Sequence, residues 1–115
     1  MRSAPNPAPY IVSVDDHLVE PPLLWEARLP AKLRAYGPRA IDTSDGVFWE
    51  FDGTRSPLSK VAASAGRPLE ERNDVAARWD EMRPGCYDPV ERVKDMDEDG
   101  VIASLCFPSM PGFGG

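Results

Sequence analysis

The chain has 115 residues, 42% of them hydrophobic and 28% charged, and a formal net charge of -6, which suits one small globular domain. The acidic balance disfavours a nucleic-acid backbone as partner. No apolar run approaches the roughly 18 residues of a membrane span, and the first residues lack the apolar core of a secretory signal. We therefore expect a cytoplasmic protein without a nucleic-acid or membrane partner, in which the two cysteines stay reduced.

The chain opens with residues 1–9, which hold three prolines and are expected to form an extended arm. The apolar, β-branched residues 10–14 predict a short buried strand. Residues 20–37 have helical character, with Pro22 suited to a first turn and Pro30 expected to interrupt the helix. Residues 46–53 are typical of a hairpin, whereas residues 54–71 predict a surface loop.

Two helices are expected in the second half. Residues 73–85 show partial helical spacing and end at a Pro-Gly pair. Residues 88–99 give the clearest signals, because Asp88 suits an N-cap, Glu91 a capping box and Gly100 the position after the helix. The three-residue spacing of its apolar residues predicts that one face is buried; these residues are Val90, Val93 and Met96.

Residues 101–108, directly after this helix, are mostly apolar and show no polar alternation, which suits a parallel strand covered on both faces. The chain thus has a strand, a long connecting segment that we call the excursion, a helix and a second strand. This order predicts a β–α–β unit and hence an α/β protein. No glycine-rich dinucleotide-binding motif is present.

The sequence Asp15-Asp16-His17 follows the first predicted strand, and functional side chains of parallel α/β proteins lie at the carboxyl ends of strands. Residues two apart in extended chain point to the same side, so Asp15 and His17 would converge. A carboxylate and an imidazole suit a borderline divalent ion such as zinc. Asp16 would point the other way, where it could support the ligands by hydrogen bonds without touching the metal or cap the following segment.

The pattern alone also fits a turn with a solvated imidazole. Catalytic zinc usually has about three protein ligands, and His17 is the only histidine in the chain. We therefore expect an incomplete metal site. Arg83 has the chemistry to meet a substrate carboxylate, although a surface salt bridge is the simpler role.

Two longer stretches carry a resemblance to a known family. They read SVDDHLVEPPLLWEARLPAKLR (residues 13–34) and RPGCYDPVERVKDMDEDGVIASLCFPSMPGFGG (residues 83–115). Together they resemble the N-terminal region of the amidohydrolase-related family, in the branch that includes aminocarboxymuconate semialdehyde decarboxylase and related aromatic-acid decarboxylases. The segment between them is less recognisable.

The resemblance implies a (β/α)8 barrel with a divalent metal at its mouth, zinc being expected and manganese the alternative. Residues 10–115 would be the N-terminal β–α–β portion of that barrel, with an irregular excursion between the first two strands. Asp15 and His17 would be metal ligands, in the acid-x-His form instead of the His-x-His form. The family's later ligands, a His and an Asp, have no match here and would lie beyond Gly115.

The resemblance further implies a hydrolase or carboxy-lyase that acts on a small carboxylated or aromatic molecule. Phe107 and Pro108 would lie near the mouth and contact this substrate, although strand packing explains them equally well. We expect the chain alone to be inactive, since it lacks the later ligands. The alternative is a non-catalytic remnant or small interaction module, for which self-association through unpaired strands is expected.

Overall fold

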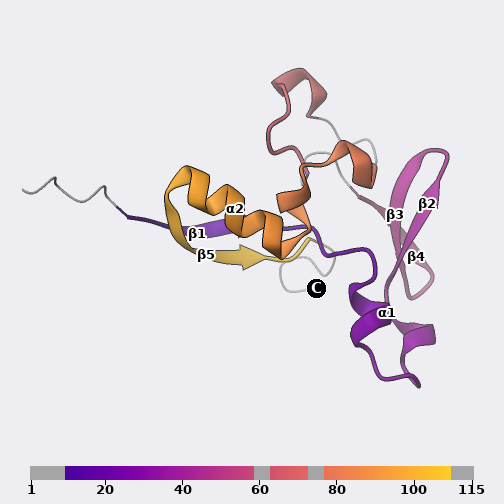
Figure 1. Cartoon of the computed structure of the whole chain (residues 1–115). Helices are drawn as coiled ribbons and strands as arrows, with labels where there is room; N and C mark the ends of the chain where they lie inside the picture. Colours follow the sequence, from indigo (N-terminus) through magenta and orange to yellow (C-terminus); the bar gives the residue numbers. More distant parts are fainter. Residues whose placement is uncertain (1–9, 59–62, 73–76, 110–115) are drawn as a thin grey trace, which may run out of the picture.

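The structure is a computed structural model that describes residues 10–58, 63–72 and 77–109. The predicted arm over residues 1–9 lies outside this part. The fold is mixed α/β, with one parallel and one antiparallel sheet (Figure 1). Its helices and strands, in chain order, are β1 (Ile11–His17), α1 (Leu24–Arg28), β2 (Arg39–Thr43), β3 (Gly46–Phe51), β4 (Thr54–Pro57), α2 (Pro89–Asp99) and β5 (Val101–Phe107).

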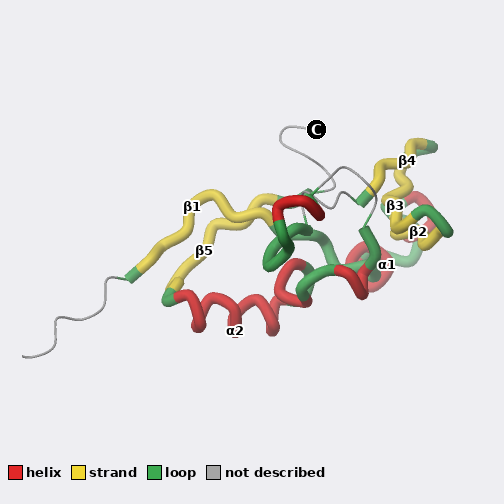
Figure 2. Tube along the Cα trace, turned by 90° about the horizontal axis from the view of Figure 1, so that it is seen from above, coloured by secondary structure: helices red, strands yellow, loops and turns green. Residues whose placement is uncertain are grey.

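The predicted β–α–β unit is present. β1 and β5 pair in parallel, and α2 leads directly into β5 and packs alongside it (Figures 1 and 2). The two strands form a two-stranded sheet in the described part of the chain. Their carboxyl ends therefore lie side by side, and this end of the sheet holds the candidate site.

β1 is longer than the sequence predicts, because it continues through Asp15, Asp16 and His17 instead of stopping before them. The reason is the partner strand. β5 extends to Phe107, and its ladder pairs Asp16 with Cys106 and His17 with Phe107. Pairing with a neighbour thus keeps a polar segment extended that has little strand preference of its own. The register shifts between Ser13 and Asp16.

The ends of α2 are those that the capping residues predict. The Asp88 side chain accepts hydrogen bonds from the backbone N–H groups of Val90 (2.8 Å) and Glu91 (3.2 Å). Gly100 ends the helix with φ +72°, in the left-handed region that favours glycine. The capping box predicted for Glu91 is not formed, because the backbone N–H of Asp88 donates to the carbonyl of Pro84 (2.8 Å) and the Glu91 carboxylate contacts Lys94, at 2.5 Å, one turn further along the helix.

The predicted buried face of α2 is wrong. Val90 is 66% exposed and Val93 55% exposed, and Met96 is only half-buried. The side of the helix toward the sheet instead carries Arg92 and Asp95, which form ion pairs there. The burial predicted for both faces of the second strand is also not observed, because Ile102 and Leu105 of β5 are each 58% exposed. The burial predicted for the strand over residues 10–14 is likewise wrong, since Val12 and Val14 of β1 are 57% and 67% exposed.

The helical character of residues 20–37 yields only a five-residue helix, α1, followed by a 3-10 turn at Arg34–Tyr36. Pro30 separates the two, as predicted. Pro22 lies in a turn two residues before α1 and is not at its first position.

None of the helices in the described part of the chain is long and apolar enough to cross a membrane.

The excursion between β1 and α2 is more regular than the sequence predicts. β3 pairs antiparallel with β2 on one side and β4 on the other, so residues 54–57 form a strand where a loop was expected. The turn from β3 to β4 consists of Asp52 and Gly53, both with positive φ (+48° and +73°). Such a two-residue turn matches the twist of a hairpin and favours this residue pair.

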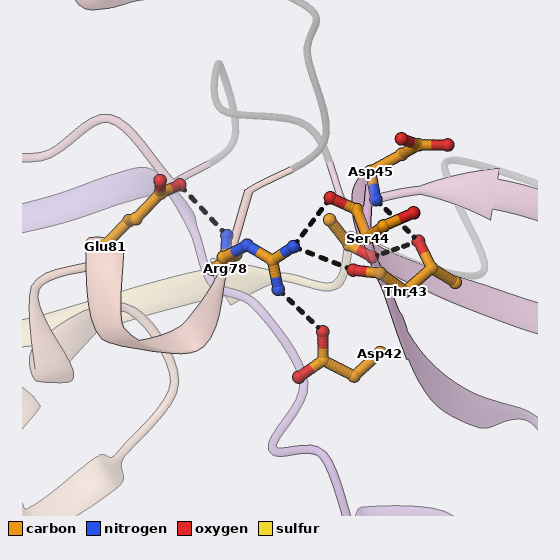
Figure 3. A network of polar contacts seen from close by, with 7 residues as sticks. Asp42, Thr43, Ser44, Asp45, Arg78 and Glu81 are labelled. Atoms are coloured by element: carbon orange, nitrogen blue, oxygen red, sulfur yellow. Dashed lines mark hydrogen bonds and ion pairs between the residues drawn. The ribbon is translucent and has the colours of Figure 1, made fainter.

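The helix predicted over residues 73–85 is not formed in its described portion, residues 77–85, where 3-10 turns occur at Trp79–Glu81 and Pro84–Cys86. Arg78 fixes this segment to the antiparallel sheet (Figure 3). Its guanidinium donates to the Asp42 carboxylate (2.9 Å) and to the backbone carbonyls of Thr43 (2.8 Å) and Ser44 (2.9 Å). Tertiary hydrogen bonds of this kind outweigh a weak helical preference.

The buried core lies between the excursion and the segment that follows β1, and not under α2. Its apolar residues come from β3, from the segments that follow β1 and β4, and from residues 77–82. They are Val19, Val47, Trp49, Leu58, Ala63, Ala77 and Met82. Trp25, Ala40, Trp79 and Tyr87 pack against it. The core therefore holds the residues just beyond the carboxyl end of β1 in place.

Candidate functional site

Asp15 and His17 lie on the same side of β1 at its carboxyl end. The imidazole Nε2 of His17 is 3.4 Å from Oδ1 of Asp15. Their side chains are 62% and 81% exposed, for His17 and Asp15 respectively, so both are open to a ligand from outside. The two donor groups converge because β1 stays extended over them, which places residues two apart on one face.

The distance between these two atoms fits two ligands of one metal ion. Two donors at about 2.0–2.2 Å from a tetrahedral ion lie about 3.3–3.6 Å apart. Oxygen and imidazole nitrogen are both ligands of zinc and of neighbouring divalent metals. Within the described ranges, however, no group of three or more His, Cys, Asp or Glu side chains is arranged to hold a metal. The residues present thus fit two ligands and not a complete site.

Asp16 lies on the opposite side, toward α2. Its carboxylate accepts hydrogen bonds from the hydroxyls of Ser13 (2.7 Å) and Ser104, and it forms an ion pair with Arg92 at 3.0 Å. The hydrogen bond from Ser104, followed by that from Ser13 and the contacts with Arg92, lowers the pKa of Asp16 below its ordinary value. Asp16 therefore joins β1, β5 and α2.

Phe107 lies beside His17, since the two residues are partners in the parallel ladder. Their ring centroids are 5.9 Å apart, with the ring planes tilted by 38°. Phe107 is half-buried and Pro108 is exposed. The structure thus brings the aromatic ring to the proposed ligand pair and leaves Pro108 at the surface next to it.

Arg83 forms a two-pronged ion pair with Asp95 of α2. Its Nε and Nη2 atoms donate to the two carboxylate oxygens of Asp95, at 2.9 and 2.6 Å. This contact raises the pKa of Arg83 and lowers that of Asp95. Arg83 therefore has the role of a surface salt bridge in this structure, on the helix side of the sheet.

The cysteines take no part in the ligand pair. Both are free thiols; Cys86 is buried and Cys106 half-buried. Burial raises the pKa of the Cys86 thiol, which disfavours the thiolate. The Cys106 sulfur lies 3.3 Å from the Ser104 hydroxyl, on the strand next to β1.

Three residues of this region were not found from the sequence. Arg92 and Ser104 hold Asp16, and Glu20 holds Ser109 just beyond the ends of the two strands. All three lie within the two stretches that carry the family resemblance, but the sequence does not indicate their partners, which lie far away along the chain. The apolar spacing of α2 indicates Val90 and Val93 as the inner residues, whereas Arg92 lies on the side toward the sheet.

Comparison with known proteins yields a similarity at the level of the fold. No family model matches the sequence, and no curated protein matches it significantly. The structure is similar to the crystal structure of an amidohydrolase from Mycobacterium avium subsp. paratuberculosis K-10, with a TM-score of 0.56 and 15% sequence identity. The similarity covers 89% of this chain and 30% of that chain. The chain thus has an α/β fold that is similar to part of an amidohydrolase.

Proposed function

We propose that this chain forms the N-terminal β–α–β portion of a metal-dependent hydrolase or carboxy-lyase of the amidohydrolase type, built on a (β/α)8 barrel. The observation that carries the proposal is the Asp15–His17 pair, whose Oδ1 and Nε2 atoms lie 3.4 Å apart at the carboxyl end of a parallel strand. The similarity of the fold to part of a solved amidohydrolase supports it.

In this proposal, Asp15 and His17 each supply one ligand to a divalent metal, zinc or manganese. Bound there, the metal would act as a Lewis acid toward a substrate oxygen or water. Asp16 contributes no ligand. It holds β1 against β5 and α2 through Ser104 and Arg92, and so fixes the direction in which its two neighbours point.

The proposed substrate is a small carboxylated or aromatic molecule. Phe107 supports this assignment, because its ring lies 5.9 Å from that of His17 and offers an apolar surface beside the ligands. Pro108 would extend that surface. Residues 10–115 would provide one wall of the pocket, and the complete reaction would need further ligands from elsewhere.

Calorimetric titration of the 115-residue chain with zinc and with manganese tests the proposal. We expect weak binding that is lost in Asp15→Asn and in His17→Ala, since two ligands hold a metal only loosely. Asp97→Asn is the matched control, because Asp97 is an exposed carboxylate on α2. Equal binding by all four proteins would contradict the proposal. We also expect no turnover of carboxylated aromatic compounds by the chain alone.

A second candidate, a non-catalytic interaction module, is favoured by the exposed apolar surface of the parallel sheet. Val12 and Val14 of β1 are 57% and 67% exposed, and Ile102 and Leu105 of β5 are each 58% exposed. Exposed apolar strands of this kind favour association. Light scattering on the wild type and on Leu105→Ser would detect it: a stable oligomer that dissociates on substitution, together with no metal binding, would favour this candidate.

A further inference from the structure

Glu20 is the one charged residue that is buried in the described part of the chain, with 3% of its surface exposed. It lies three residues beyond the end of β1. Its carboxylate accepts two hydrogen bonds from the same residue, Ser109. The backbone N–H of Ser109 donates to Oε1 (3.1 Å), and the Ser109 hydroxyl donates to Oε2 (2.6 Å). The two residues are 89 positions apart in the sequence.

Burial of a carboxylate is unfavourable unless hydrogen bonds replace its lost hydration. Val19 belongs to the apolar core, whereas its neighbour Glu20 does not. The two hydrogen bonds to Ser109 offset part of the cost of burying the carboxylate, since a charged acceptor makes stronger hydrogen bonds than a neutral one.

The Glu20–Ser109 contact follows two backbone hydrogen bonds that hold the residues after β1, one to the last residue of β5 and one to the segment before α2. The backbone N–H of Leu18 donates to the carbonyl of Phe107 at 3.2 Å, and that of Val19 donates to the carbonyl of Cys86 at 2.8 Å. Glu20 then continues the series through its side chain. It ties the residues after β5 to the residues after β1, just beyond the point where His17 and Phe107 are paired.

We infer that Glu20 is a positioning residue of the proposed site, which holds Ser109 and thereby sets Phe107 against His17. This inference rests on the proposed function. Both carboxylate oxygens of Glu20 accept a hydrogen bond from Ser109, so Ser109 is held at a fixed distance from Glu20 and cannot rotate about a single bond between them. Phe107 precedes Ser109 by two residues, so fixing Ser109 also restricts the position of the Phe107 ring.

The test uses the 115-residue chain and variants that remove the contact in steps. Ser109→Ala removes the hydroxyl and keeps the backbone donor, whereas Ser109→Thr keeps both. Glu20→Ala removes both acceptors. Ser56→Ala, at an exposed serine of β4, is the matched control for Ser109→Ala. Three quantities are measured. They are the amide hydrogen exchange rates at residues 18 and 109, the nuclear Overhauser effect between the rings of His17 and Phe107, and the half-broadening Mn²⁺ concentration, at which paramagnetic broadening reduces the peak intensity of the His17 signals to half.

We expect Ser109→Ala to speed amide exchange at residue 109 by about tenfold and to weaken the His17–Phe107 effect. It should also raise the half-broadening Mn²⁺ concentration by a few fold while the melting temperature stays close to that of the control. Ser109→Thr should restore all three quantities. A purely structural role for the contact would lower the melting temperature and leave the Mn²⁺ concentration of the folded protein unchanged.

Unchanged exchange and ring contact in both Ser109→Ala and Glu20→Ala would overturn the inference. If Glu20→Ala does not fold, Ser109→Ala and Ser109→Thr decide the question by themselves. Failure of the proposed function has a different signature, because the wild-type His17 signals would then not respond to Mn²⁺ at all. In that case the exchange rates and the ring contact still show whether Glu20 positions Phe107.

Discussion

Arg92 of α2 and Asp16 of β1 form an ion pair, with Nη2 3.0 Å from Oδ2. This contact assigns the middle residue of the Asp15-Asp16-His17 sequence to the helix side of the sheet. The residues before and after it lie together on one side of the strand, 3.4 Å apart at their nearest donor atoms. One short sequence thus serves two purposes: its middle residue joins the elements, and its outer residues face solvent as a candidate ligand pair.

Asp16→Asn should lower the free energy of unfolding at pH 7 by about 1.5–3 kcal/mol, the usual range for hydrogen bonds to a charged group. The hydrogen bond from Ser104 is the main reason that the pKa of Asp16 lies below its ordinary value of 3.8 in the folded chain. The unfolded chain therefore takes up the proton first as the pH falls. The stabilisation is present above about pH 4 and is lost as the pH falls through the folded-state pKa.

Urea denaturation of both proteins between pH 7 and pH 2 measures this difference. The gap between wild type and Asp16→Asn should narrow on the acidic side. Asp97→Asn, at an exposed carboxylate of α2, serves as the matched control. A gap that stayed constant down to pH 2 would show that the charge of Asp16 contributes nothing to stability.

An acidic substitution at position 93 should be tolerated, although the apolar spacing of α2 suggests otherwise. Val93 is 55% exposed, so Val93→Asp should change the free energy of unfolding by less than about 1 kcal/mol. Val47 is fully buried in the core, and Val47→Asp should prevent folding because it buries an unpaired charge. Melting temperatures and soluble yields of the two variants test this contrast; a severe loss for Val93→Asp would mean that α2 is covered in solution.

Asp88→Ala should destabilise the chain by about 1 kcal/mol, because the Asp88 side chain caps two backbone N–H groups at the start of α2. Asp88→Asn keeps an acceptor at the same place and should recover most of the loss. Chemical denaturation followed by circular dichroism measures both variants. Equal losses for alanine and asparagine would contradict the capping role.

The parts of the fold that the sequence predicts correctly are those with coincident local signals. α2 has Asp88 at one end and Gly100 at the other, and the apolar run after it forms β5. The strand β4 was missed, since its residues Thr54–Pro57 are polar and become a strand only by pairing with β3. The buried face that the sequence predicts for α2 is wrong, because spacing identifies a stripe of residues but not what covers it.

The candidate site was predictable in part. Strand alternation places Asp15 and His17 on one side, and this follows from the sequence alone once the strand extends over them. The Glu20–Ser109 and Arg92–Asp16 contacts were not predictable, because they join residues 89 and 76 positions apart, and no local pattern indicates such pairs.

The central claim is that Asp15 and His17 bind one divalent metal, and nitrogen NMR of the imidazole tests it most directly. His17 is the only histidine in the chain, so a ¹⁵N-histidine-labelled sample gives the signals of one ring. On addition of zinc, the Nε2 signal should shift toward that of a metal-bound nitrogen, and Asp15→Asn should require a higher zinc concentration for the same shift. Zinc-independent Nε2 signals, or identical titrations for the wild type and Asp15→Asn, would contradict the claim.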